Sequence, residues 1–255
     1  MSEPKGKTLA ETQKRGASPD DPWEEGPRHG QLAEGKAPRE KVDVPIEPPD
    51  DMDEKSGLRS EHLWDLYALP QPVVLVTTVD LDGNVNCAPK NWVTHAGARH
   101  FAFVCSTEHD TYMNAQTTRE FVVNVPGADL VPKLHALARR GTASWEDETR
   151  RAGLTAVPSA KVKPPRIAEC RAHLECRVTL LHRTSTKEHL GSEKAGTDVL
   201  VLGEVVAASA DAEVVRARTY AERVALVRPF VLAPIWSYAV VDRVEPLPEQ
   251  WDLEY

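Results

Sequence analysis

Short runs of strand-forming residues, separated by turn residues, dominate the sequence between residues 73 and 206. An apolar run at residues 73–79 is followed by turn residues at 80–83 and a second run at 84–88, which together predict a β-hairpin. Many short strands with few helices favour a sheet that closes on itself, because closure removes exposed edges. The sequence therefore predicts a mainly β fold, a β-barrel with peripheral helices. Its further strands are expected at residues 101–105, 121–125, 174–180 and 199–206.

Helices are expected at a few places around this sheet. Ser60 can cap a helix in which Leu63, Leu66 and Tyr67 share one face, and Pro70 ends it. The other helical segments are a short one between the strands at 101–105 and 121–125, one at 130–140 and one at 211–227.

The first part of the chain has a different composition. Eight of the 20 prolines lie in the first 50 residues, among Gly, Lys, Glu and Asp. Such a segment buries too little apolar surface to offset the entropy of ordering its backbone. We expect residues 1–55 to be a disordered tail and residues 56–255 to form the folded domain. An alternative is that Trp23 and residues 42–46 dock on a partner subunit.

Charge and sequence patterns exclude several classes of protein. The formal net charge of −8 argues against nucleic acid or anionic lipid as a partner. Neither an apolar signal segment nor a membrane-spanning apolar stretch is present, so a cytoplasmic protein is expected. The four cysteines have no C-x-x-C spacing and the histidines no H-E-x-x-H pattern, so buried thiols and no metal site are expected.

Common catalytic motifs are also missing from the sequence. It has no G-x-S-x-G elbow, no phosphate-binding G-x-x-x-x-G-K-[ST] loop and no G-x-G-x-x-G fingerprint. Spacing alone thus indicates a soluble β-rich domain and no more.

Three blocks of sequence resemble the flavin reductase-like family, the FMN-binding split barrels. Residues 69–89 resemble the opening of that family. Residues 109–114 and 120–126 resemble its Lys-Asp-Thr-x-x-Asn and Phe-x-Val-Asn segments, and residues 152–169 continue the match in order. The resemblance covers about residues 65–210.

This resemblance implies a six-stranded Greek-key split barrel that forms a homodimer, with FMN near the subunit interface and NADH or NADPH as co-substrate. The implied activity is that of an NAD(P)H-dependent flavin reductase, as in the reductase component of a two-component monooxygenase. Hydride transfer to flavin depends on position rather than on an acid or base, so no catalytic side chain is assigned. The sequence does not choose between the two nicotinamide cofactors.

A phosphate site is implied at the start of the predicted short helix. Free backbone N–H groups there favour an anion, and the Thr111 hydroxyl would add a donor. The alternative for Thr111 and Asp110 is ordinary helix capping. The other candidates in this segment are Ser106, Thr107 and His109.

A flavin-ring site is implied at residues 86–92. The flavin ring needs hydrogen-bond donors at its pyrimidine edge, where negative charge grows on reduction. The candidates are Asn86, the main-chain N–H groups of Cys87 and Ala88, and the side chains of Lys90, Asn91 and Trp92. The family commonly has an aromatic residue and then Ser or Thr where this chain has Lys90 and Asn91.

Several of these residues have more than one interpretation. Lys90 can stabilise reduced anionic flavin, bind a nicotinamide-cofactor phosphate, or point into solvent. Asn124 is either a buried amide satisfied by the backbone or part of the flavin pocket. Lys163 and Arg166, which flank two prolines, can bind phosphate or contact a second subunit.

Two other functions remain open at this point. One is a split-barrel flavoenzyme that keeps FMN tightly and acts on a dedicated organic substrate. The other is a non-enzymatic FMN-binding electron-transfer module.

Overall fold

The computed structural model describes residues 69–137, 148–184, 198–233 and 237–245 of the 255-residue chain. The chain divides into two units, residues 1–52 and 53–255, and every described residue belongs to the second. The expected tail and the helix predicted at residues 60–67 lie outside the described residues.

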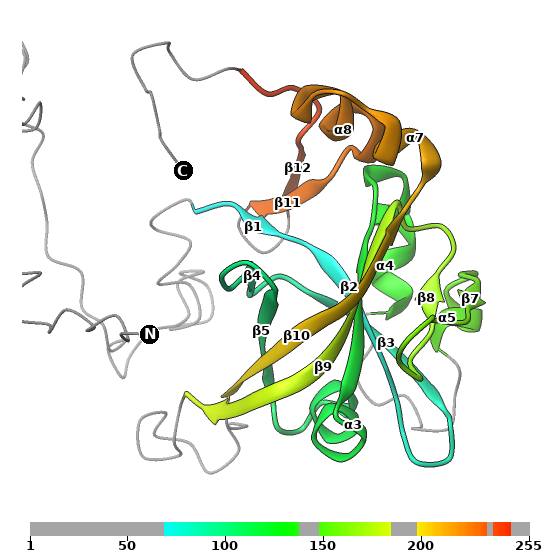
Figure 1. Cartoon of the computed structure of the whole chain (residues 1–255), viewed down its shortest axis with the longest axis vertical. Coiled ribbons are helices and arrows are strands. Elements are labelled where there is room, and N and C mark those ends of the chain that lie inside the picture. Colours follow the sequence, from blue (N-terminus) through cyan, green and yellow to red (C-terminus); the bar gives the residue numbers. More distant parts are fainter. Residues whose placement is uncertain (1–68, 138–147, 185–197, 234–236, 246–255) are drawn as a thin grey trace, which may run out of the picture. The chain divides into compact units, whose positions relative to one another are not determined.

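A curled seven-stranded sheet forms the body of the described part (Figure 1). Each neighbouring pair in it is antiparallel. In order across the sheet, the strands are β3 (Val85–Lys90), β2 (Val74–Val79), β6 (Glu120–Val125), β9 (Ala172–Arg183), β10 (Asp198–Ala210), β5 (His100–Ser106) and β4 (Val93–His95).

The sheet confirms the predicted mainly β fold and differs from it in the number of strands. All six strands expected from the sequence are present, and β4 is the additional seventh strand. It is only three residues long and lies at the edge of the sheet, paired with β5. Its half-exposed Val-Thr-His sequence has no apolar run that would have signalled a strand.

The predicted hairpin is formed by β2 and β3, whose turn is held by one side chain. The Asp80 carboxylate accepts hydrogen bonds from the backbone N–H groups of Asp82 and Asn84, at 2.9 and 2.8 Å. Gly83 has φ +88°, which a residue with a side chain rarely adopts. These contacts fix the register that places Asn86 opposite Thr78 and Lys90 opposite Val74.

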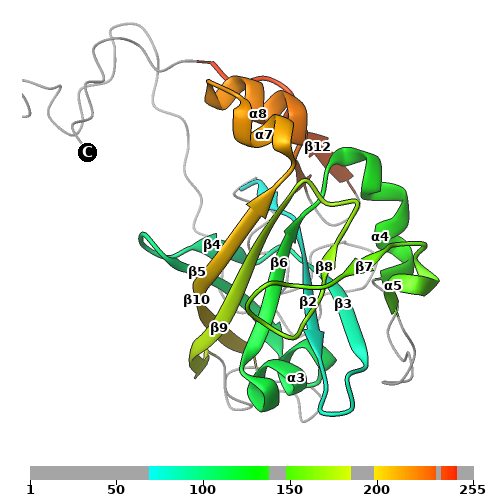
Figure 2. The same ribbon diagram turned by 45° about the vertical axis from the view of Figure 1, so that its right-hand side comes forward.

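Helices lie at the ends of the sheet and over one face (Figure 2). The single helical segment predicted at 211–227 is two helices, because residues 217–219 are non-helical and Thr219 begins the second with a capping box to Glu222. The helices are α3 (Asp110–Thr118), α4 (Val131–Leu137), α5 (Glu148–Arg151), α7 (Ala212–Arg216) and α8 (Tyr220–Val227), with a 3-10 turn η2 (Ala128–Leu130).

Two small sheets complete the described part. One joins β1 (Gln71–Pro72), β11 (Phe230–Ala233) and β12 (Ser237–Val240), and the other pairs β7 (Ala156–Val157) with β8 (Arg166–Ile167). None of the described helices is long and apolar enough to cross a membrane.

The two faces of the main sheet bury separate apolar clusters, since side chains along a strand alternate between faces. The inner cluster includes Val74, Val76, Phe103 and Phe121. The outer cluster, between the sheet and the α4, α5 and β8 layer, is formed by Leu75, Cys87, Leu130, Leu137, Ala152, Leu154, Ile167 and Cys170.

Candidate functional site

The residues predicted to surround a flavin ring lie along β3 and the loop after it. The register with β2 places Asn86, Ala88 and Lys90 on the same face as Thr78, Val76 and Val74 respectively. Val74 and Val76 belong to the inner cluster. Asn86 and Lys90 are therefore directed to the inner side of the curled sheet, at the two ends of one edge strand.

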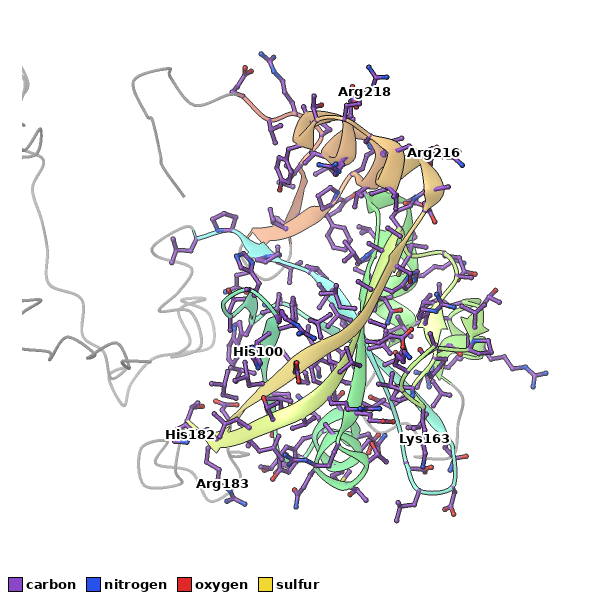
Figure 3. The ribbon with its side chains drawn as sticks, in the orientation of Figure 1. His100, Lys163, His182, Arg183, Arg216 and Arg218 are labelled. Carbon is purple, nitrogen blue, oxygen red and sulfur yellow. The ribbon has the colours of Figure 1, made fainter. Side chains whose placement is uncertain are left out.

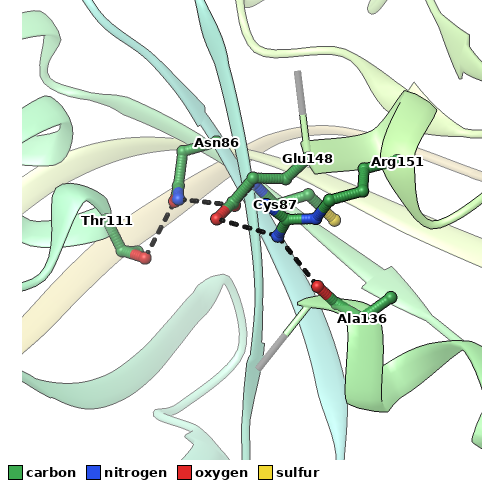
Figure 4. Close-up of polar contacts among 6 residues, drawn as sticks. All are labelled: Asn86, Cys87, Thr111, Ala136, Glu148 and Arg151. Atoms are coloured by element: carbon green, nitrogen blue, oxygen red, sulfur yellow. Dashed lines mark hydrogen bonds and ion pairs between the residues drawn. The ribbon is translucent and has the colours of Figure 1, made fainter. Parts of the chain in front are cut away.

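A buried carboxylate holds the first end of this strand (Figure 4). Glu148 Oε2 accepts hydrogen bonds from Asn86 Nδ2 at 2.8 Å and from the Cys87 backbone N–H at 3.0 Å. Its other oxygen lies 3.8 Å from Arg151 Nη2, which also donates to the Ala136 carbonyl oxygen at 2.8 Å. Glu148 is only 7% exposed, so these contacts compensate the burial of its charge.

The amide oxygen of Asn86 extends this network to the helix α3. Thr111 Oγ1 donates to Asn86 Oδ1 at 3.0 Å, and Thr78 Oγ1 donates to the same oxygen at 3.3 Å. Asn114 of α3 in turn donates to Thr78 Oγ1 at 3.2 Å. The hydroxyl proton of Thr111 is thus directed at Asn86, and the residue is 1% exposed.

The start of α3 contains the other predicted phosphate ligands. His109 is the N-cap and makes no side-chain capping bond to the helix, so neither Asp110 nor Thr111 is the cap. In the turn before it, Ser106 Oγ accepts a hydrogen bond from the Glu108 backbone N–H at 3.2 Å. Thr107 is half-buried in the same turn.

The main-chain donors of β3 are used within the protein. The Cys87 N–H is bonded to Glu148. Since successive N–H groups of a strand point in opposite directions, that of Ala88 faces β2. Both N–H groups thus face other parts of the protein.

Lys90 stands at the other end of β3, where it is 8% exposed and makes no hydrogen bond or ion pair within the described part of the chain. Burial lowers the pKa of its ammonium, and the nearby Cys105 and Glu148 oppose this shift. The interpretation in which Lys90 points into solvent is therefore wrong.

The loop after Lys90 is fixed to its surroundings. Asn91 Nδ2 donates a hydrogen bond to Gln71 Oε1 of β1. The Trp92 carbonyl oxygen accepts from the Val104 N–H of β5 at 2.9 Å, while the Trp92 side chain is 43% exposed. An exposed indole on a fixed loop is available for stacking on a flat ligand.

Asn124 is fully buried and its amide is satisfied within the protein. Nδ2 has three acceptors, the carbonyl oxygens of Leu75 and Val122 and Thr77 Oγ1, at 3.2–3.4 Å. Oδ1 accepts from the Ile167 backbone N–H at 2.8 Å. The structure supports the first of the two interpretations, a buried amide satisfied mainly by the backbone.

Lys163 and Arg166 belong to the segment around β8 and are not joined to the β3–α3 network. Lys163 is exposed (Figure 3), and its backbone N–H donates to Glu120 Oε2 at 2.9 Å. The Arg166 guanidinium donates to the Pro158 carbonyl oxygen at 2.8 Å and to Ser209 Oγ at 3.1 Å. These contacts connect the β8 segment to β10.

A hollow of about 400 Å³ lies away from the network, on the β5–β10 side of the sheet. None of the predicted cofactor residues lines it. We therefore place the candidate site at β3 and α3, where the polar groups converge, rather than at this hollow. Its lining residues are His95, Gly97, Ala98, Arg99, His100, Phe101, Leu174, Val205, Val206, Ala207 and Ala208.

Sequence reasoning missed Glu148 and Arg151. Their only local signal is an acid and a base three residues apart, which is common on solvated helices. Their burial and their contact with Asn86 become visible only in the fold.

One structural observation, the position of Lys90, makes the residues of this site suitable for a flavin. Lys90 is a buried cation that shares its nearby carboxylate, Glu148, with Arg151, and it lies at the end of the strand assigned to the flavin ring. An electron-poor ring that gains negative charge on reduction is a suitable partner for such a group. Among the described residues, no cluster of three or more His, Cys, Asp or Glu side chains could hold a metal ion.

A curled antiparallel sheet with an apolar cluster on each face and few helices is the architecture of a split-barrel protein. The sequence profile described as "Flavin reductase like domain" matches residues 66–225, so the chain belongs to the flavin reductase-like family. An uncharacterised protein of Methanothermobacter thermautotrophicus is 35% identical over 141 residues, which are 54% of this chain and 62% of that relative. The match thus spans about three fifths of the relative's length.

Solved structures show the same fold. Component B of nitrilotriacetate monooxygenase from Bacillus cereus superposes with a TM-score of 0.66 at 21% identity, over 82% of this chain and all of that one. A split-barrel protein from Shewanella frigidimarina also has a TM-score of 0.66, at 17% identity, over 78% of this chain and 94% of that one. At these identities the likeness concerns the fold alone.

Proposed function

We propose that this protein is an FMN-dependent oxidoreductase that transfers hydride from NADH or NADPH to flavin. The observation that carries the proposal is the 3.0 Å hydrogen bond from Thr111 to Asn86. It joins the two segments that the family resemblance assigns to the flavin phosphate and the flavin ring. A cofactor that must contact both segments requires such a fixed distance between them.

The chain's own residues would bind and orient the cofactor. When bound, the flavin supplies the acceptor for the nicotinamide hydride. The first backbone N–H groups of α3 have no partner inside the helix, so with Ser106, Thr107 and His109 they form the proposed phosphate site. Trp92 offers an apolar surface for the ring, and Asn91 fixes the loop that carries it.

The Glu148 network supports the proposed cofactor-binding segments through contacts within the protein. By bonding Asn86 and Cys87 it holds the start of β3 against α3 and α5. We assign no proton-transfer step to the Glu148 network, because hydride transfer depends on positioning rather than on acid–base chemistry.

The structural neighbour that is component B of a monooxygenase supports a two-component arrangement for this chain as well. In that arrangement the reduced flavin leaves for a partner oxygenase. A cytoplasmic homodimer with flavin at the subunit interface is part of the same proposal.

The test is a visible spectrum of the purified full chain with and without FMN, followed by anaerobic addition of NADH or NADPH. We expect FMN binding and loss of the flavin absorption band with one or both nucleotides. FMN that stays oxidised with both nucleotides would contradict the reductase and favour an electron-transfer module. If flavin remains bound through gel filtration, a flavoenzyme with its own organic substrate is favoured over a diffusible-flavin reductase.

A pair of variants tests the location of the site. Asn86→Ala should weaken FMN binding, whereas Lys161→Met should not, since the Lys161 side chain is exposed and away from this network. Equal affinities in the two variants would contradict the assignment of the site to β3 and α3.

A further inference from the structure

Lys90 is a largely buried lysine at the end of β3. Its side chain is 8% exposed and has no hydrogen-bond or ion-pair partner within the described residues. It lies on the inner face of the edge strand, opposite Val74. Two residues further on, the backbone bond between Trp92 and Val104 brings this end of β3 against β5, which carries Cys105.

Two acidic groups lie near Lys90, and both oppose the effect of burial on the pKa of its ammonium. Burial raises the pKa of the Cys105 thiol to about 11, so the thiol is uncharged near neutral pH. The Glu148 carboxylate already accepts bonds from Asn86 and Cys87 and lies beside Arg151. Among the described residues, Lys90 therefore shares the Glu148 carboxylate with Arg151.

Two cations that share one buried carboxylate leave positive charge uncompensated, which lowers the stability of a fold, so the position of Lys90 needs a reason outside the fold. The strand that carries Lys90 is the one assigned to the flavin ring. We propose that Lys90 compensates the negative charge that bound flavin acquires on reduction. The proposal rests on the proposed function of the same site and adds to it the residue that sets the reduction potential.

The charge balance of the reaction explains this role. A hydride brings two electrons and one proton equivalent, so a neutral flavin ring that accepts it carries one negative charge while the nicotinamide becomes its oxidised cation. A cation close to the ring stabilises that reduced form more than the oxidised form. Differential binding of the two forms is what raises a reduction potential.

The experiment compares wild type with Lys90→Met, Lys90→Arg and the control Lys161→Met, each as the full chain. Dissociation constants are measured for oxidised FMN and for dithionite-reduced FMN, and the midpoint potential of bound FMN is measured against a reference dye. We expect Lys90→Met to bind oxidised FMN within threefold of wild type and reduced FMN at least tenfold more weakly. A tenfold change in the ratio of the two dissociation constants corresponds to a fall of about 30 mV in the two-electron potential. Lys90→Arg and Lys161→Met should stay close to wild type.

The outcomes separate the two proposals. If NADH or NADPH reduces the wild type while Lys90→Met has an unchanged potential, the role of Lys90 is overturned and the reductase stands. If neither nucleotide reduces the flavin but the potential falls as expected, the reductase fails and Lys90 keeps its role. If wild type binds no FMN, both are overturned. Should Lys90→Met fail to fold, Lys90→Gln is the second variant without the charge, and the same expectations apply to it.

Discussion

The two ends of β3 bury polar groups in opposite ways. At the start of the strand, Asn86, Glu148 and Thr111 satisfy one another, with every bond at 2.8–3.0 Å. At its end, Lys90 is buried and has no hydrogen-bond or ion-pair partner in the described residues. The two ends of the strand thus differ in how far hydrogen bonds satisfy their polar groups.

This difference indicates which end serves the fold and which serves function. A hydrogen-bonded network stabilises because its groups keep hydrogen bonds after leaving water, and in this one the Arg151 Nε is the exception. A buried cation without such bonds destabilises for the opposite reason. Local violations of good packing are expected where a protein binds or reacts. Under the proposed function, the start of β3 supports the fold and its end faces the ligand.

The largest effect is expected from Glu148→Ala. It leaves Arg151 without its acidic neighbour and removes the acceptor for Asn86 and the Cys87 N–H. Breaking a buried pair on one side costs about 3 kcal/mol of unfolding free energy. Urea denaturation followed by circular dichroism measures it.

Glu120→Ala is the matched control for this prediction. The Glu120 carboxylate also accepts a backbone bond, from Lys163, but its ion-pair partner Arg177 is 59% exposed. Solvent screens such a pair, so a loss of about 1 kcal/mol is expected. Similar losses of unfolding free energy in the two variants would mean that the buried Glu148 contributes no more stability than the solvent-screened Glu120.

The next effect has the opposite sign. Lys90→Met in the flavin-free protein removes a buried charge that only the shared Glu148 carboxylate compensates among the described residues, and it keeps most of the side-chain volume. We expect the free energy of unfolding to rise by about 2 kcal/mol at neutral pH. A lower or unchanged stability, measured by the same denaturation against Lys161→Met, would show that Lys90 has a compensating partner.

The same substitution should also change the pH dependence of stability. Burial lowers the folded-state pKa of Lys90 below its ordinary value of 10.5, so the folded state binds fewer protons than the unfolded state between the two values. The destabilisation is full below the folded-state pKa and disappears as the pH rises toward 10.5. Unfolding curves of wild type and Lys90→Met should converge over that window, and a constant gap would contradict the assignment to Lys90.

Much of the sheet could be predicted from the sequence because strand signals are local. The apolar runs and the Asp80–Gly83 turn predict β2 and β3 directly, and the alternation in residues 174–180 predicts β9. The lengths of the strands were harder to predict from the sequence. β9 runs to Arg183 and β10 to Ala210, since pairing between two long strands extends them beyond their apolar runs.

The site was predictable only as a set of segments. Asn86 and Thr111 could be proposed together through the family resemblance, and the fold joins them. Glu148 lies 62 residues after Asn86 in the chain, and no local pattern relates the two. For Lys90, the sequence left open whether it points into solvent, and only the register of β3 against β2 decides that it faces inward.

The smallest effect is expected from Thr111→Val, which tests the link between the support network and α3. Valine keeps the shape of threonine but cannot donate to Asn86 Oδ1, which still accepts from Thr78 at 3.3 Å. One lost hydrogen bond with a partly satisfied acceptor costs about 1 kcal/mol of unfolding free energy. Thr111→Ser keeps the hydroxyl and should recover most of it. Because the Thr111 proton is directed at Asn86 and not at a ligand, riboflavin and FMN should lose affinity to the same degree in Thr111→Val. A loss confined to FMN, measured by fluorescence titration, would instead show that this hydroxyl contacts the phosphate.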